Sequence, residues 1–399
     1  MCRNPVSGSL STDERWNLLT AAALRRSIDW RMILYLTVAV GTVLLACLVN
    51  NKPLVQPYRV TRQQMCNGVC LLSVFLILFL LSAFRQNVGN DYAKYVEFMH
   101  LVNCDAYVPT EAGFNQLVKI IYGLSGFENY LLVFAVYAFV TIFLFLLAIY
   151  EQSDEFPFTY FLFMTLGYYF QSFSTVRYYL ALAIALYSMK FVIRKQWGRF
   201  ILLVVLGSFF HKSLLVILPL YFLASLTWKK WQLALIGLFC TTFLFLQDFY
   251  LQVVVFLYPT YEETEYLEGG TSYINILRCI AVLVFSLFYY RKSIQGNRKM
   301  QFYFYLNLGA LVLYVFCSFL PIISRIGYYL TISHILFLPA LIRETENEKW
   351  KKLLRAGVVA AAVCYFAIYM SRAYDDGTRI LPYQSFWFHD MVDILSDVS

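Results

Sequence analysis

Few side chains in this 399-residue sequence could do chemistry, and seven of them stand in or beside the connections between apolar runs. They are Arg85, Asp91, Glu111, Arg177, His211, Lys212 and Arg325. An arginine guanidinium keeps its charge near pH 7, and its planar fork binds phosphate oxygens in pairs. A carboxylate or an imidazole can accept the proton of a sugar hydroxyl. These residue types therefore suit a site that binds a diphosphate and moves a proton.

Tyrosines accompany this set, and they are Tyr92, Tyr95, Tyr178 and Tyr328. Because the C–H face of a sugar ring is apolar, it can stack on such aromatic rings. Each residue also has a structural interpretation, since arginine and tyrosine are common anchors at the membrane interface. It is the convergence of several connections on one predicted face that favours a functional site.

The elements that position these residues must be membrane helices. The chain is 60% hydrophobic and 14% charged, with a mean hydropathy of +0.61, whereas an average soluble domain is about 45–50% apolar and about 25% charged. This composition disfavours a soluble enzyme, a nucleic-acid-binding module and a disordered protein. The sequence predicts an all-α polytopic membrane protein. The net charge of +8 does not indicate a nucleic-acid partner, because the basic residues are interspersed among apolar runs.

Apolar runs long enough to span a membrane lie near residues 32–49, 67–84, 130–150, 156–170, 178–193, 232–247, 274–290, 301–320, 326–342 and 353–370. A further run, 200–226, is too long for one span, and polar residues at His211 and Lys212 interrupt it. Polar side chains at mid-membrane are costly, so two short helices that turn at these residues fit better. About 11–12 transmembrane helices are expected, with a long outer loop, 85–128, between the second and third.

The lysines and arginines predict the orientation of these helices. If successive connections alternate sides, one side receives most of the basic residues with few acids, and the other receives more acids than bases. The basic side should be cytoplasmic. The predicted organisation is a polar N-terminal tail over 1–30, one transmembrane domain over 31–370, and a C-terminal tail over 371–399 on the outer face. The candidate site residues all fall at the outer face, and the side of the N-terminal tail stays open.

Nine cysteines occur, and none has the spacing of a zinc site. Most stand in apolar stretches and suit packing. We expect no metal and no other cofactor.

Five short motifs resemble, in the same order, motifs of the EpsG family of bacterial membrane proteins, relatives of the Wzy-type polysaccharide polymerases. The segments are 85–95, similar to the family's R-x-x-V-G-T-D-Y-x-x-Y loop; 111–114, similar to E-P-G-F; 173–178, similar to F-x-x-x-R-Q; 210–213, similar to F-H-x-S; and 325–329, similar to a late R-x-x-Y-Y/F segment. Asn90, Ala112 and Tyr178 depart from the Thr, Pro and Gln of these motifs. The resemblance covers roughly residues 30–390.

The resemblance implies a glycosyltransferase with a GT-C-like glycan polymerase architecture in the bacterial cytoplasmic (inner) membrane, with its active face outward. Such enzymes join oligosaccharide repeat units carried on undecaprenyl diphosphate into exopolysaccharide, capsule or O-antigen. The implied partners are that lipid-linked oligosaccharide, the lipid bilayer, and a chain-length regulator and a flippase of the same pathway. Which polymer is made stays open.

The hypothesis for the site gives each residue a role. Arg85, Arg177 and Arg325 hold the diphosphate and stabilise the leaving group. His211 or Asp91 is the base, and Glu111 orients either that base or the acceptor sugar. Lys212, Tyr92, Tyr95, Tyr178 and Tyr328 contact the diphosphate or the glycan.

Two other classes of function remain open. A flippase of lipid-linked glycan would place its site at mid-membrane within repeated halves, but the sequence has no internal repeat. A membrane acyltransferase that modifies a surface polysaccharide could use His211 as its base, but the arginines would then have no evident role.

Overall fold

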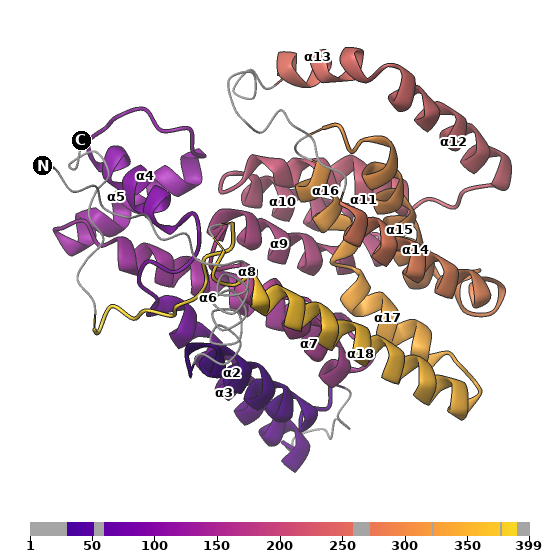
Figure 1. Cartoon of the computed structure of the whole chain (residues 1–399), viewed down its shortest axis with the longest axis horizontal. Helices are drawn as coiled ribbons and strands as arrows, with labels where there is room; N and C mark the ends of the chain where they lie inside the picture. The colour runs from indigo at the N-terminus through magenta and orange to yellow at the C-terminus, as the bar shows by residue number, and fades with distance from the viewer. Residues whose placement is uncertain (1–29, 52–59, 258–271, 321–322, 376, 389–399) are drawn as a thin grey trace, which may run out of the picture.

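The computed structural model of the chain describes residues 30–51, 60–257, 272–320, 323–375 and 377–388 (Figure 1). The predicted N-terminal tail lies, but for its last residue, outside the described residues. The described part is helical and contains no β-strand, apart from an isolated bridge between Arg85 and Ser385. The predicted fold class is confirmed: the protein is an all-α polytopic membrane protein.

The helices follow one another without intervening sheets. In chain order they are α2 (Trp30–Cys47), α3 (Arg62–Ala83), α4 (Tyr92–Asn103), α5 (Ala112–Ser125), α6 (Tyr130–Gln152), α7 (Phe156–Thr165), α8 (Tyr168–Gln171), α9 (Val176–Ile193), α10 (Trp197–Ser208), the 3₁₀ turn η1 (Lys212–Val216), α11 (Ile217–Ala224), α12 (Lys230–Phe245), α13 (Gln247–Leu257), α14 (Tyr273–Phe288), the π turn η4 (Tyr290–Ile294), α15 (Arg298–Phe316), α16 (Ile323–Thr331), α17 (His334–Arg343) and α18 (Glu348–Ser371).

Five helical segments among the described residues are long and apolar enough to cross a membrane. They are α3, α6, α9, the joined α16 and α17, and α18. Shorter apolar helices are α2, α7, α10, α14, and η1 with α11. Since several expected spans form these shorter helices, the number of 11–12 crossings stays a prediction.

The core of the bundle is built on α9. This helix is largely buried, and it packs along α6 and α10. Ala181, Ala183 and Ala185 alternate with larger residues and are almost fully buried. Small residues at a helix interface let neighbouring backbones approach closely, and membrane helices use this to associate without a hydrophobic driving force between them. By contrast, α3 and α18 expose most of their apolar surface and lie at the periphery.

Three of the expected apolar runs are broken helices. The break at His211, between α10 and η1, is where the sequence predicts it. The sequence does not predict the other two. Gly167 has a left-handed φ of 78° and separates α7 from α8, and Ile332 and Ser333 separate α16 from α17.

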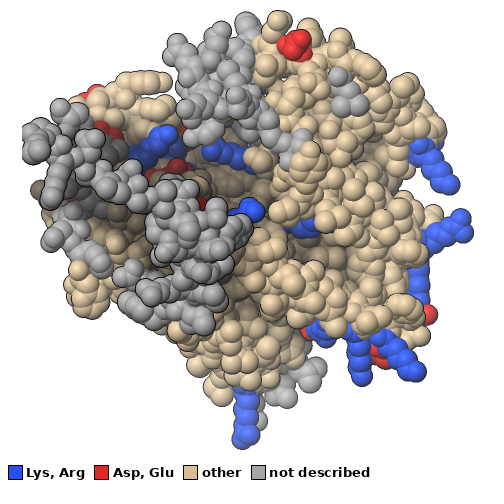
Figure 2. Space-filling model, viewed as in Figure 1, with Lys and Arg blue, Asp and Glu red and all other residues tan. Residues whose placement is uncertain are grey.

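Connections that were expected on the same side of the membrane meet at the same end of the bundle. At one end, Lys299 and Arg343 pair with Asp154, while Arg355 pairs with Glu155. Figure 2 shows Lys and Arg side chains projecting from one edge, and further charged side chains of both signs inside a hollow elsewhere on the same face. The contacts support the predicted alternation of connections.

At the other end, the predicted outer loop and the described part of the C-terminal tail, residues 371–375 and 377–388, pack together. Residues 85–128 contain the helices α4 and α5. The backbone amide of Gln86 donates a hydrogen bond to the carbonyl oxygen of Gln384 at 2.9 Å. The backbone amide of Gly89 donates to the carbonyl oxygen of Arg379 at 2.8 Å. Gly89 has a φ of 107°, and a Cβ at this position would lie 2.3 Å from the Phe173 carbonyl oxygen. The conformation and the close approach both require glycine here.

Candidate functional site

The Glu111 carboxylate brings three predicted connections together. It forms an ion pair with Arg177. Its Oε1 atom accepts a hydrogen bond from the amide of Lys212 at 3.0 Å and lies 3.4 Å from Nδ1 of His211. The side chains of Glu111 and Arg177 are only 11% and 13% exposed, so these contacts are shielded from water. The structure thus places at one point residues that the sequence assigns to separate motifs.

Local structure explains why Glu111 is free to make these contacts. It is the residue before α5, in an extended conformation, and its side chain makes no capping hydrogen bond. The amide of Gly113 donates to the carbonyl of Phe209 at 2.8 Å, which ties the start of α5 to the chain just before His211. The backbones approach so closely that a Cβ on Gly113 would lie 2.6 Å from that oxygen. Glycine at this position therefore sets the distance between Glu111 and His211.

Replacing Gly113 with alanine is expected to destabilise the protein. The added methyl group must displace backbone, and overpacking of this kind typically costs about 1–3 kcal/mol. Thermal unfolding of the detergent-purified protein measures the effect. Gly123→Ala in the same helix is the matched control, because a Cβ there meets nothing within 4 Å and alanine favours helix. Equal melting temperatures for the two variants would contradict the close approach.

Arg177 lies between Glu111 and two aromatic rings. Its Cζ is 5.5 Å from the ring centroid of Tyr95 and 5.3 Å from that of Phe114. Arg177 stands in the first turn of α9, where the helix dipole disfavours a cation; the Glu111 carboxylate offsets this. Its Nε is buried and has no hydrogen-bond partner among the described residues. The carboxylate and the two rings thus hold the guanidinium in place.

The environment of Glu111 and His211 sets their protonation states. Burial alone would raise the pKa of the Glu111 carboxyl, but its contacts to the imidazole, the guanidinium and the Lys212 amide outweigh burial and bring this pKa to about 2. Burial lowers the pKa of His211; Glu111 opposes this shift, while Arg177 and Arg325 add to it, and the net pKa lies below the usual value. At neutral pH the site therefore holds a carboxylate beside a neutral imidazole. Nδ1 of His211 lies against the Glu111 carboxylate, while the buried Nε2 has no hydrogen-bond partner among the described residues.

Asp91 and Arg325 belong to the same electrostatic group. Burial raises the pKa of the Asp91 carboxyl; the charges of Lys94, Arg325 and Arg177 oppose this shift without cancelling it. Asp91 precedes α4 but makes no capping hydrogen bond with its side chain. Arg325 is exposed on α16, so its guanidinium is accessible to a ligand.

Tyr178 links Arg325 to His211. Its hydroxyl donates to the backbone carbonyl of Arg325 at 2.7 Å, and its ring centroid is 5.7 Å from that of His211. The ring of Tyr329 packs on Tyr178 at 5.3 Å, and its hydroxyl is 2.8 Å from Oγ of Ser213. Neither Tyr329 nor Ser213 was among the predicted site residues, although both stand in the motifs quoted above. The helical phase of α16 decides whether Tyr328 or Tyr329 faces the site, and a sequence motif does not specify this phase.

Arg85, one of the three arginines assigned to the diphosphate, is not part of this cluster. It is 1% exposed, its Nη1 donates to the backbone and hydroxyl oxygens of Ser82, and the rings of Tyr92, Phe134 and Phe173 surround it. The cavity beside it measures about 10 Å³, which holds no more than one water molecule. Arg85 is therefore enclosed apart from Arg177 and Arg325, and the structure does not bring together the three arginines that the sequence groups.

Three other predicted residues also differ from expectation. Tyr92 packs on Phe134, and its hydroxyl donates to the backbone carbonyl of Arg85 at 3.3 Å, so Tyr92 lies in the aromatic packing around Arg85 and not at the Glu111 cluster. Tyr328 faces Tyr168 and Arg278 instead of His211. The side chain of Lys212 is exposed, and its amide makes the contact at the site.

The structure also singles out Arg278, which the sequence analysis did not. It lies within the apolar helix α14, its guanidinium is 5.9 Å from the ring of Tyr328, and its Nε and Nη2 are buried without a partner among the described residues. An ionisable residue inside a membrane helix is a signal that could have identified it. As for metals, no group of three or more His, Cys, Asp or Glu that could hold an ion occurs in the described part of the chain.

Comparison with known proteins agrees with the motifs at this site. The sequence profile of the EpsG family matches residues 68–385, which is most of the chain and includes every residue of the cluster. No curated protein and no solved structure matches, so the expected GT-C-like architecture stays a prediction. The long family match establishes the relationship, and the chain belongs to the EpsG family.

Proposed function

We propose that this protein is a glycosyltransferase that polymerises oligosaccharide repeat units carried on undecaprenyl diphosphate. The family suggests a role of this polymerase type. The observation that carries the proposal is the Glu111 contact set, which joins an arginine and a neutral histidine at one shielded point. A cation for a leaving phosphate and a base for an attacking hydroxyl are the two groups that such a transfer needs.

In the proposed reaction a hydroxyl oxygen of the incoming lipid-linked unit attacks the anomeric carbon of the growing glycan. The new glycosidic C–O bond forms as the C–O bond to the diphosphate breaks, and the leaving diphosphate takes the bonding electron pair. The hydroxyl proton goes to the base. The arginines stabilise the negative charge that develops on the diphosphate.

His211 is the better candidate for the base. Its depressed pKa keeps the imidazole neutral at pH 7, and Glu111 can hold the Nδ1–H tautomer, which leaves Nε2 free to accept a proton. Asp91 is the second candidate for the base, because its carboxylate makes no helix-capping hydrogen bond and interacts electrostatically with Arg325 and Arg177. Glu111 itself is a positioning residue, since its acidity makes it a poor base.

Arg325 and Arg177 are the proposed diphosphate ligands. Arg325 is exposed, and the charge of Arg177 lies beside it at the Glu111 cluster. Tyr95 packs against Arg177, and Tyr178 and Tyr329 pack beside His211 and Ser213; because these rings are buried, they position the site's polar groups. Arg85 has a structural role in this proposal, because it joins α3 to the rings around it.

The site is proposed to face outward from the bacterial cytoplasmic membrane. The opposite end of the bundle carries the basic connections and their ion pairs, as the cytoplasmic side should. The polymer, whether exopolysaccharide, capsule or O-antigen, is left open by this proposal.

The direct test is elongation by the purified full-length protein in vesicles that contain a labelled lipid-linked repeat unit. The expected result is a ladder of longer lipid-linked glycans with release of undecaprenyl diphosphate, and without any nucleotide sugar. Transfer of the label across the bilayer without lengthening would instead identify a flippase. Acyl modification without lengthening would identify an acyltransferase. Either result would overturn the proposal.

A further inference from the structure

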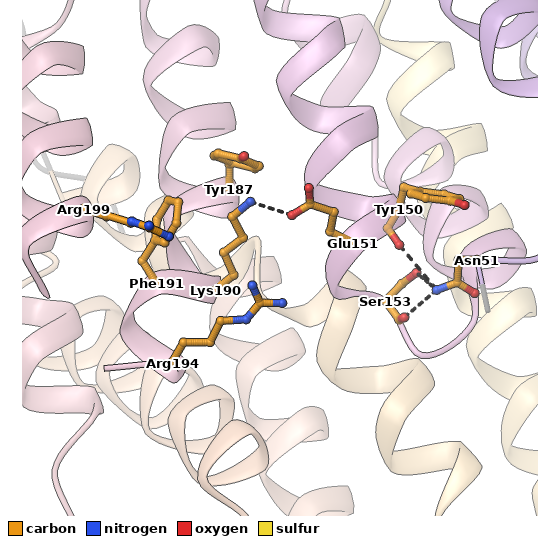
Figure 3. Close-up of a pocket in the computed structure, with 9 residues that line it drawn as sticks. All are labelled: Asn51, Tyr150, Glu151, Ser153, Tyr187, Lys190, Phe191, Arg194 and Arg199. Atoms are coloured by element: carbon orange, nitrogen blue, oxygen red, sulfur yellow. Dashed lines mark hydrogen bonds and ion pairs between the residues drawn. The ribbon is translucent and has the colours of Figure 1, made fainter. Parts of the chain in front are cut away.

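A second polar site lies at the basic end of the bundle, in an open pocket of about 750 Å³ (Figure 3). Its lining comes from the ends of α6 and α9, the start of α10 and the segment after α2. None of its residues belongs to the Glu111 cluster, and the proposed polymerisation gives them no role. Glu151, Lys190, Arg194 and Arg199 are the charged residues of the lining.

The pocket is preformed on one side. The side-chain amide of Asn51 donates to the backbone carbonyl of Ser153 at 2.7 Å and to the hydroxyl of the same residue at 3.2 Å. These bonds hold the segment after α2 against the end of α6, as Figure 3 shows. A ligand that enters would therefore meet a wall that is already ordered.

The pocket has an excess of positive charge. Lys190 is 8% exposed and pairs with Glu151 at 2.5 Å, and its Nζ is 3.6 Å from the ring centroid of Tyr187. No ion-pair partner occurs for Arg194 or Arg199 in the part of the chain that the structure describes. Three cations thus share one carboxylate, and the two guanidinium groups remain able to bind an anion bidentately.

Helix electrostatics accounts for only part of this arrangement. Lys190 in the last turn of α9 and Arg194 just after that helix are where the helix dipole favours cations. Arg199 lies in the first turn of α10, where the dipole disfavours a cation, and no acid stands in that turn. Apart from a hydrogen bond from Nη1 of Arg199 to Oε1 of Gln196 at 3.4 Å, the local helix offers this cation no partner, whereas an anion shared with Arg194 would be an oppositely charged one.

The surface beside the pocket is apolar. On α10, one to two turns beyond Arg199, Leu202 and Leu206 are 60% and 53% exposed. A soluble phosphate compound would leave this surface uncovered, but the acyl chains of a lipid would cover it. The pocket also lies at the ends of the membrane-spanning helices α6 and α9, which is the depth of lipid headgroups.

We propose that this pocket binds the phosphate of an anionic phospholipid, with Arg194 and Arg199 as the phosphate ligands and Lys190 as a third cation. Basic pockets between membrane helices on the cytoplasmic side are a recognised setting for acidic headgroups. The site is separate from the Glu111 cluster, so the inference does not depend on the proposed polymerase activity.

Native mass spectrometry of the full-length protein, titrated with phosphatidylglycerol or phosphatidylcholine, tests this proposal. We expect selective retention of phosphatidylglycerol, and an apparent Kd at least about tenfold weaker in the Arg194→Gln/Arg199→Gln double variant, since each surface cation contributes about 1 kcal/mol to anionic lipid binding. The matched control, Lys230→Gln/Arg291→Gln, removes the same charge from two exposed residues outside the pocket and should retain wild-type affinity.

Three outcomes would overturn the proposal. Equal weakening in the two double variants would show that only the total charge of this end matters. Equal retention of phosphatidylcholine would show that the pocket does not select an anion. Displacement of phosphatidylglycerol by micromolar glycerol 3-phosphate would assign the phosphate site to a soluble ligand.

Discussion

Replacing Arg325 with alanine is expected to lower the turnover of polymerisation about 100- to 1,000-fold, with a much smaller change in KM. Loss of one donor that stabilises developing charge typically costs this much, or about 3–4 kcal/mol of activation free energy. A group that acts more strongly in the transition state than in the ground state changes kcat more than KM. Initial rates of glycan elongation at varied concentrations of lipid-linked unit measure both constants.

The structure makes Arg325 a clean position for this experiment. Its side chain is exposed, and Tyr178 contacts its backbone carbonyl, which alanine retains. We therefore expect an unchanged melting temperature. Arg325→Lys should recover only part of the rate, because it keeps the charge but loses the bidentate fork. Arg372→Ala removes an exposed arginine that follows α18 and should leave turnover unaltered. Normal turnover in Arg325→Ala would remove this residue from the diphosphate site.

Replacing His211 with glutamine is expected to lower turnover about 100- to 10,000-fold, which is the usual contribution of a general base. Glutamine retains polarity and approximate size but cannot accept a proton at neutral pH. His100→Gln is the matched control. His100 stands on α4, lies 3.0 Å from the Glu128 carboxylate and takes no part in the Glu111 cluster. Rates measured from pH 5 to 8 add a readout that a purely structural role would not change.

The pH dependence has a defined sign. Wild-type activity should fall on acidification as His211 gains a proton, with a midpoint below the usual histidine pKa of about 6.5, since burial lowers the pKa of this group. Glu111 raises the pKa of His211, so Glu111→Gln should move the midpoint to still lower pH while it slows turnover. If His211→Gln kept the wild-type rate and acid limb, the base would have to be Asp91.

Composition and local pattern were enough to predict the fold class and much of the helix layout. Charges and polar groups are costly in lipid, so apolar runs mark membrane helices wherever they occur in the sequence. The same cost predicted the break at His211, which the structure contains between α10 and η1. The alternation of basic and acidic connections predicted which loops meet at each end. These features depend on the content of each segment and not on its neighbours in space.

The tertiary structure alone decided which candidates meet. The sequence motifs grouped Arg85 with Arg177. In the structure, aromatic rings enclose Arg85, whereas Glu111 and two rings hold Arg177 at the site. The sequence analysis assigned Tyr328 to the site. In the structure, the helical phase of α16 turns Tyr329 toward Ser213 instead. The direction of a side chain depends on helix phase and on which surfaces pack together, and both are set by contacts between residues far apart in the chain. Sequence therefore determined that the loops predicted to lie outside carry a candidate site, and packing determined that Glu111 joins its residues.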